Sequence, residues 1–151
     1  MLRFRTLGLL PLLLLLSCAR EKPATMEDLT SATVTLPGGQ KIKAERMVLT
    51  SDMARGMMFR DSLASDRGML FFHEKEGLYT YWMYQTRIPL DMIWMDRYRR
   101  VVEIVADAPP CKTAASQCPH YGGARRAQYV LELAGGMAAK YGLKVGDLLD
   151  F

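Results

Sequence analysis

The chain has 151 residues, of which 50% are hydrophobic and 24% are charged, with 20 Lys and Arg against 16 Asp and Glu. A chain of this length and composition can bury one hydrophobic core, which excludes collagen-like, coiled-coil and wholly disordered proteins. Arg3 and Arg5 lie in the amino-terminal segment, and the remainder carries 18 positive against 16 negative side chains. This small excess argues against nucleic acid as a partner, because that binding needs a strongly basic face.

Residues 1–17 predict a signal peptide. Two arginines precede an apolar run over residues 7–16, which is about half of the roughly 20 residues that a membrane-spanning helix needs. The sequence Leu-Leu-Ser-Cys at residues 15–18 resembles the bacterial lipobox, in which Cys18 receives a diacylglycerol on its sulfur and becomes the first mature residue. An ordinary signal peptide followed by an unmodified cysteine is the alternative.

Two or three acyl chains on Cys18, palmitate among them, would anchor the protein stably to a membrane. We therefore expect a lipoprotein of the cell envelope that faces the periplasm. Ala19, rather than Asp, follows the cysteine and favours the outer membrane if the cell is Gram-negative. The remainder divides into a lipidated cysteine with a flexible tether over residues 18–30 and a single β-rich domain over residues 31–151. The expected partners are the membrane and an unknown small ligand or envelope protein.

The sequence of the domain predicts short strands rather than long helices. A hairpin turns at residues 37–39, its second strand extends to residues 47–49, and helical turns follow over residues 53–59. Apolar, aromatic or β-branched runs then predict strands over residues 69–72, 79–83, 90–95, 101–106 and 129–133, a helix over 136–141 and a last strand over 143–151. No helix of crossover length separates the strands. The predicted fold is therefore mainly β, an antiparallel sandwich or barrel-like domain with one or two short helices.

The cysteine count favours a disulfide. If lipid occupies Cys18, the remaining Cys111 and Cys118 form a pair, as is usual in an exported domain. A zinc site that also uses His120 lacks an obvious fourth ligand, and a Cys118–His120 nucleophile pair lacks a third group to orient it. We expect no metal and no cofactor.

Asp91 is a carboxylate within the apolar strand 90–95. A buried and unpaired charge is prohibitive, so Asp91 must pair with an arginine, accept backbone N–H groups or face a cleft. Arg55 and Arg60 are the candidate partners. Two interpretations remain open, a structural ion pair or loop clamp and a ligand site.

Six ordered blocks carry a family resemblance. They are residues 55–60 (RGMMFR), residues 68–72 (GMLFF), Trp82-Met83 with Thr86, residues 88–91 (IPLD) with Ile93, residues 129–133 (YVLEL) with Gly136, and Gly146-Asp147. In this order they resemble the bacterial and archaeal family called domain of unknown function 192, over about residues 33–151. Residues 109–111 and 118–121 resemble a loop of many exported members. The resemblance implies a compact, mainly β fold and, as the family's name says, no established activity.

The polar residues of the matching blocks form the candidate ligand site: Arg60, Trp82, Gln85, Thr86, Asp91 and Glu132. Gln85 stands where the family usually has Asn, which would put a family activity in doubt if that Asn were catalytic. Glu132 lies between two leucines and points away from them, toward solvent if that face is open. The sequence departs from the family pattern at two further places. Met137 stands where the family often has Trp or Thr, and residues 96–99 form a turn that often carries Gly in the family.

No motif of a known enzyme class is present: the sequence lacks Gly-x-Ser-x-Gly, His-Glu-x-x-His and a phosphate-binding glycine loop. A lipid-anchored module that binds a small ligand or a protein is therefore the first interpretation. The second is a hydrolase of an envelope glycan that uses Asp91 and Glu132, which requires both carboxylates in one cleft. The third is Cu(I) handling by methionines 53, 57, 58, 92 and 95, against which stands their ordinary use as core fillers.

Overall fold

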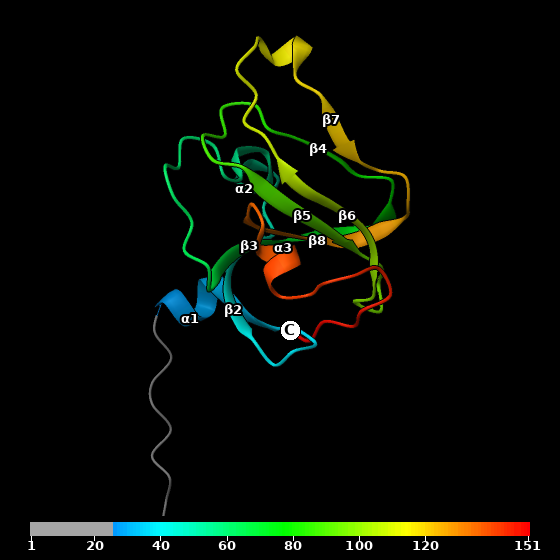
Figure 1. The fold of residues 1–151 in the computed structure, drawn as a ribbon. Helices are drawn as coiled ribbons and strands as arrows, with labels where there is room; N and C mark the ends of the chain where they lie inside the picture. Colours follow the sequence, from blue (N-terminus) through cyan, green and yellow to red (C-terminus); the bar gives the residue numbers. More distant parts are fainter. Residues whose placement is uncertain (1–25) are drawn as a thin grey trace, which may run out of the picture.

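A computed structural model describes residues 26–151, which form a mainly β domain (Figure 1). Its elements in chain order are α1 (Met26–Thr30), β1 (Ser31–Thr35), β2 (Lys41–Met47), α2 (Thr50–Arg55), β3 (Arg67–Gly77), β4 (Thr80–Trp82), β5 (Leu90–Met95), β6 (Val101–Ala108), the 3-10 turn η1 (Ala115–Gln117), β7 (His120–Gly122), β8 (Ala127–Ala134) and α3 (Met137–Lys140). The predicted mainly β, sandwich-like fold with short helices is confirmed.

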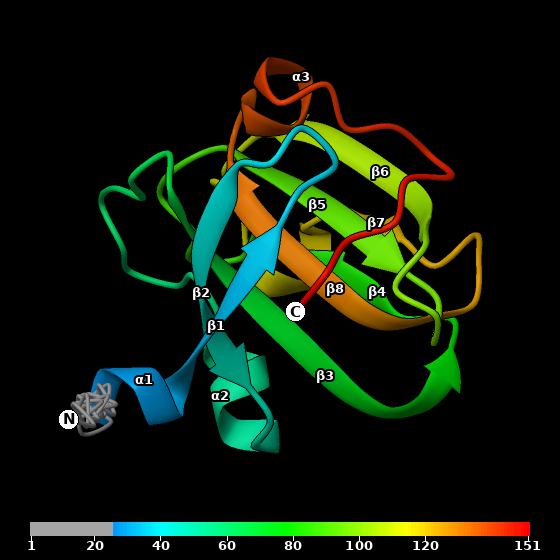
Figure 2. The same ribbon diagram turned by 90° about the horizontal axis from the view of Figure 1, so that it is seen from below.

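Six strands form the main sheet in the order β1-β2-β3-β8-β5-β6, and β4 and β7 form a small second sheet. Figure 2 shows β8 between β3 and β5, in the middle of the main sheet. Every neighbouring pair is antiparallel except β2 and β3, which are parallel. The sheet is therefore mixed, which corrects the expected all-antiparallel arrangement. A parallel pair needs a crossover connection, and residues 48–66, which include α2, supply it.

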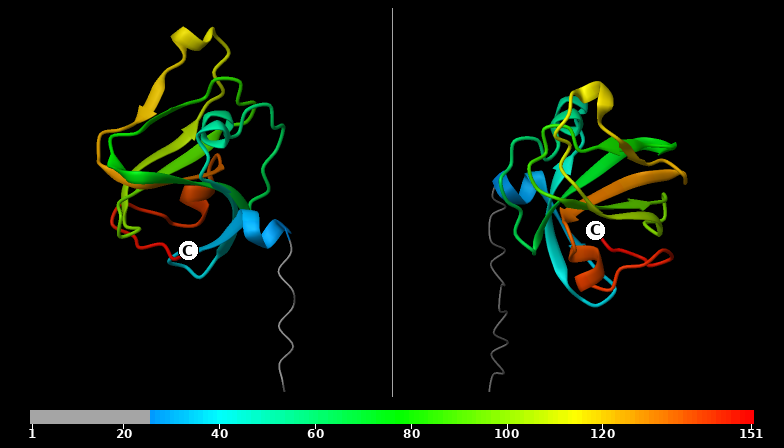
Figure 3. Two further views of the ribbon diagram at one scale, coloured as in Figure 1. Left: turned by 180° about the vertical axis from the view of Figure 1, so that it is seen from behind. Right: turned by 45° about the horizontal axis from the view of Figure 1, so that its top comes forward.

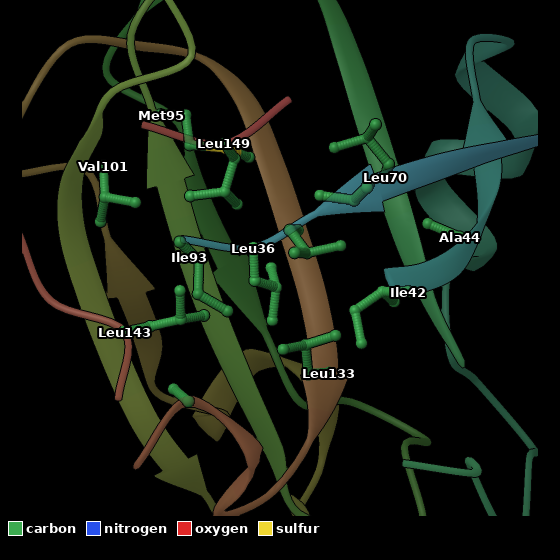
Figure 4. Close-up of a cluster of buried hydrophobic side chains, with 13 residues drawn as sticks. Leu36, Ile42, Ala44, Leu70, Ile93, Met95, Val101, Leu133, Leu143 and Leu149 are labelled. Atoms are coloured by element: carbon green, nitrogen blue, oxygen red, sulfur yellow. The ribbon is translucent and has the colours of Figure 1, made fainter. Parts of the chain in front are cut away.

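The main sheet buries apolar side chains on both faces. On the first face lies a cluster that β1, β2, α3 and the carboxyl-terminal segment complete; Figure 4 shows its members Leu36, Ile93, Leu133 and Leu149, among others. The second face carries a cluster rich in methionine and aromatic side chains, against which Met53 and Tyr81 pack from α2 and β4. Side chains alternate between the faces along each strand, so adjacent residues contribute to different clusters.

The small sheet packs on the second face. The ring of Trp94 lies so close to Gly122 that a Cβ there would overlap it, and the indole Nε1–H donates to the carbonyl of Tyr79 at 2.9 Å. Glycine at position 122, with φ of 73°, therefore allows β7 to approach the main sheet. Figure 3 shows the segment before β7, coloured yellow, extending beyond the main sheet.

Several predicted elements match the structure closely. The first hairpin is present as β1 and β2, β5 has the predicted bounds, and β3, β6 and β8 contain the predicted runs with extra residues. The predicted strand over 143–151 is wrong, since only isolated bridges at Leu148 and Asp150 join this segment to Arg100 and Thr35. The helix expected over 53–59 lies three residues or more earlier, and β7 was not predicted.

Cys18 and the predicted signal peptide lie outside the described residues, and α1 occupies the end of the predicted tether. Within residues 26–151, no helix has both the length and the apolar character to span a membrane.

Candidate functional site

Asp91 is fully buried and clamps the end of β6 and the start of α3 to β5. Its Oδ1 accepts hydrogen bonds from the backbone N–H groups of Asp107 at 2.7 Å and Gly136 at 3.0 Å, and its Oδ2 accepts one from Ala138 at 2.6 Å. Charge-assisted bonds of this kind compensate the cost of burying a carboxylate. The geometry supports the loop-clamp interpretation, with backbone amides in place of the arginines considered as partners.

Asp91 and Glu132 lie on opposite faces of the main sheet. In the pairing of β5 with β8, Asp91 is opposite Leu133 and Met92 is opposite Glu132. Directly paired residues share a face, and adjacent residues do not. Leu133 belongs to the first-face cluster and Met92 to the second. The two carboxylates therefore do not face one cleft, and the hydrolase hypothesis built on this pair is wrong.

Glu132 is buried on the second face, which corrects the expectation that it points toward solvent. Its side chain lies between the paired residues Met69 of β3 and Met92 of β5, and the residue is 4% exposed. Burial raises the pKa of Glu132 to about 8, and the Arg60 guanidinium offsets part of this effect. Its Oε2 has no hydrogen-bond partner among residues 26–151. At neutral pH Glu132 is mainly a neutral carboxylic acid with unused hydrogen-bonding capacity.

Glu132 is one of the residues that line a narrow cavity of about 30 Å³, called here the Glu132 slot. Thr86, 6% exposed, is the second buried polar residue that lines it. The remaining lining comes from α2 and the residues after it, and from an aromatic group: Met53, Ala54, Arg55, Gly56, Met57, Met58, Phe71, Tyr81, Trp82 and Tyr84. The sequence did not predict Phe71, Tyr81 and Tyr84 as site residues, although the aromatic run at residues 79–84 was a usable signal for the two tyrosines.

A groove of about 310 Å³ adjoins the slot and shares Met53, Ala54, Tyr81 and Trp82 with it. We call it the α2–β4 groove, because these two elements form its walls. His73 also lines it, and its Nε2 lies 3.2 Å from the hydroxyl of Tyr81. Burial lowers the pKa of His73, while burial and the Glu132 carboxylate raise the pKa of Tyr81. Both groups are therefore uncharged at neutral pH.

Arg60 lies outside the slot and is engaged elsewhere. Its two terminal nitrogens bond to the two carboxylate oxygens of Glu45, the Nη2–Oε2 distance being 2.8 Å. The hydrogen bonds to Glu45 raise the pKa of Arg60. Arg60 therefore acts on Glu132 through its electric field rather than by direct contact.

Gln85 lines a different concavity of about 610 Å³, which Phe59, Arg87 and Cys111 also border. Its backbone has φ of 55°, in the left-handed region, and its carbonyl accepts the Phe59 N–H at 2.9 Å. Asn adopts this conformation more readily than Gln does. The backbone conformation is therefore sufficient to explain why the family usually has Asn at this position, and no catalytic role is required.

The predicted disulfide between Cys111 and Cys118 is present. The zinc and nucleophile alternatives therefore lose their free thiols. The disulfide closes the loop before β7, where His120 pairs with Trp82 of β4 and stacks on it with ring centroids 5.8 Å apart. The disulfide thus closes the loop that leads to His120, the residue stacked on Trp82 of the groove.

The methionines of the copper hypothesis divide between the two faces. Met57 and Met92 belong to the second-face cluster, whereas Met95 belongs to the first. Met92 and Met95 therefore do not form a common ligand set. No group of three or more His, Cys, Asp and Glu side chains suited to a metal ion occurs within the described part of the chain.

Of the six predicted site residues, the structure gathers Trp82, Thr86 and Glu132 in one slot. Arg60 lies near it, Gln85 lines the adjacent concavity, and Asp91 is on the opposite face.

Comparisons with known proteins agree with this fold. The family model described as DUF192, Uncharacterized ACR, matches residues 32–151. A crystal structure of a protein of unknown function from Novosphingobium aromaticivorans has a TM-score of 0.71 and 34% identity, covering 80% of this chain and 84% of that one. A structure from Sinorhizobium meliloti, proposed in its name to be a transcription regulator, has a TM-score of 0.69 and 28% identity, covering 78% and 89%. Among curated proteins, the comparison finds no match.

Proposed function

Since this chain belongs to the domain of unknown function 192 family, whose name assigns no activity, we propose a function from its own site: a lipid-anchored module of the cell envelope that binds a small ligand in the Glu132 slot and the α2–β4 groove. The lipobox-like residues 15–18 support the anchor, and the disulfide between Cys111 and Cys118 is consistent with an oxidising compartment.

The buried Oε2 of Glu132, which has no hydrogen-bond partner among residues 26–151, is the observation that carries the binding function. Leaving a buried polar group unsatisfied costs about 1–3 kcal/mol. Glu132 bears this cost where it lines a cavity that shares four residues with a groove, rather than in a closed core. A ligand that supplies the missing hydrogen bond would recover the cost, which gives the site a physical preference for an occupied state.

The same geometry favours binding over hydrolysis. Two-carboxylate hydrolysis needs a second acid or base within about 10 Å on the same cleft. No other Asp or Glu lines the Glu132 slot among the described residues, and Glu45 is engaged by Arg60.

Ligand binding is tested with the full-length protein in detergent by thermal shift, against panels of small amines, small anions, metals and envelope glycan fragments. We expect a hit that stabilises the parent and fails to stabilise Glu132→Gln. Glu74→Gln, at an exposed carboxylate on β3, is the matched control and should respond as the parent does. Hits that stabilise Glu132→Gln equally would refute this site.

The anchor is tested separately by labelling cells with radioactive palmitate. We expect label on the parent protein and none on Cys18→Ser, together with a shift of that variant from the membrane to the soluble fraction. An unlabelled parent protein would refute the lipoprotein assignment without affecting the binding site.

A further inference from the structure

The size of the Glu132 slot limits what can reach the carboxyl. A cavity needs about 10–15 Å³ of such volume to hold one water molecule, and the slot has about 30 Å³. A head group of one or two non-hydrogen atoms fits, whereas a phosphate, a carboxylate or a sugar ring does not. The rest of a ligand can lie in the α2–β4 groove of about 310 Å³, since a cavity of roughly 150 Å³ already holds benzene.

The polar groups of the slot favour a ligand head group that donates hydrogen bonds. In its ionised form, which Glu132 adopts above its pKa of about 8, the carboxylate only accepts hydrogen bonds, and a hydroxyl can accept as well as donate. Glu132 Oε2 is without a donor, and the hydroxyl-bearing Thr86 lines the same cavity. A group with several donor hydrogens on one small atom matches both, and a primary ammonium has three.

The aromatic walls add a preference for positive charge. Phe71, Tyr81 and Trp82 line the slot, and the Phe71 and Tyr81 rings lie edge to face with centroids 5.1 Å apart. The face of an aromatic ring attracts a cation within about 6 Å, and more strongly where the cation is desolvated. A hydroxyl or amide head group would gain nothing comparable from these rings.

The charges around the slot are compatible with a cation. Arg55 lines the slot from α2 but is exposed, so solvent screens its charge. The charge of Arg60 is paired with Glu45 of β2. From β3 and β4, His73 and Tyr81 face the site as uncharged groups. The residues that pair with Glu132 on β3 and β5 are Met69 and Met92.

From this geometry we infer that the ligand carries a primary ammonium group, which lies in the slot against the Glu132 carboxylate and the Phe71, Tyr81 and Trp82 rings while its apolar body occupies the α2–β4 groove. The inference rests on the proposed function. Binding ionises Glu132 and releases its proton, so affinity rises with pH until the amine itself loses its charge.

Four probes of matched shape test the head group: benzylamine, benzyl alcohol, benzamide and benzoate. Their dissociation constants are measured by calorimetry with the full-length protein in detergent, at pH 6 and pH 8. We expect benzylamine to bind tightest, and at least tenfold tighter at pH 8 than at pH 6, because the pKa of Glu132 is about 8 whereas a primary amine titrates near 10. Glu132→Gln should weaken benzylamine at least tenfold at pH 8, and Glu74→Gln should leave it unchanged.

Trp82→Leu keeps an apolar side chain in the wall but removes an aromatic ring. This variant should weaken the binding of benzylamine more than the binding of benzyl alcohol. Preferential binding of the alcohol, amide or benzoate, lost in Glu132→Gln, would overturn the ammonium inference and leave the proposed function standing. Binding of benzylamine that is independent of pH and of Glu132 would also overturn the inference. Absence of binding by all four probes, together with no Glu132-dependent hit in the wider panel, would overturn both.

Discussion

Phe59 and Gln85 both have positive φ, 65° and 55°, and the Phe59 N–H donates to the Gln85 carbonyl at 2.9 Å. Next to this bond, Met58 and Thr86 form an isolated antiparallel bridge. These contacts hold the chain after α2 against the chain after β4, next to Thr86, which lines the Glu132 slot. Two residues in an unfavourable backbone region are the cost of this local connection.

Gln85→Asn should raise the free energy of unfolding by about 0.5–1 kcal/mol, because Asn tolerates the left-handed conformation better than Gln. Urea denaturation measures the change. Gln40→Asn, at an exposed position without positive φ, should bring no gain. A loss of stability in Gln85→Asn would instead show that the longer side chain makes contacts that outweigh backbone strain.

Glu132→Gln should be more stable than the parent at pH 8, and the two should converge toward pH 4.5. The folded state holds the Glu132 proton up to a pKa of about 8, whereas the unfolded state releases it near 4.5. The parent therefore loses stability as the pH rises through this interval, by about 4–5 kcal/mol relative to the variant. Urea denaturation from pH 4.5 to 8.5 gives the difference.

The comparison of variants is needed because His73, whose pKa burial lowers, has the opposite effect on stability as the pH rises toward 6.5. Both proteins contain His73, so its contribution cancels in the difference. A difference that does not change with pH would mean that Glu132 titrates normally and is not desolvated.

Asp91→Asn should destabilise the fold by about 2–3 kcal/mol and leave ligand binding intact. The Asn amide has only one acceptor oxygen, so its NH₂ group would face one of the backbone N–H groups that now donate to Asp91. The remaining hydrogen bonds would change from charge-assisted to neutral ones. Asp61→Asn, which breaks an exposed pair with Arg87, should cost under about 1 kcal/mol. Loss of ligand binding by Asp91→Asn at unchanged stability would return Asp91 to the site.

Replacing both Cys111 and Cys118 by Ser should cost about 2–3 kcal/mol, as the chain-entropy model gives for so short a loop. The effect should be local to the small sheet. Amide hydrogen exchange is therefore expected to accelerate in β4 and β7 while the main sheet keeps its protection. Faster exchange throughout β3, β5 and β8 would show that the disulfide supports the whole fold.

Local patterns were sufficient for much of the fold. The first hairpin follows from alternation around a glycine turn, and β5 follows from its apolar and β-branched run with a proline before it. The need of Asp91 for partners also follows from burial. The identity of those partners does not, because Asp107, Gly136 and Ala138 are 16, 45 and 47 residues away.

The site itself depended on an arrangement that the sequence does not reveal. Alternation along β8 correctly placed Glu132 on the face opposite Leu131 and Leu133. Whether that face is covered depends on the path of residues 48–66, which cross it because β2 and β3 are parallel. No short-range signal distinguishes this pairing from a hairpin, so the burial of Glu132 and its neighbours could not be predicted.

The central position of β8 also bears on how the protein matures. This strand follows both β3 and β5 in the chain, yet it separates them in the sheet and presents side chains to both clusters. A nascent chain that ends before residue 127 can form the first hairpin but cannot join the two halves of the sheet. The two halves of the sheet can therefore join only after β8 has been synthesised, and Glu132, which lies on β8, can become buried only then.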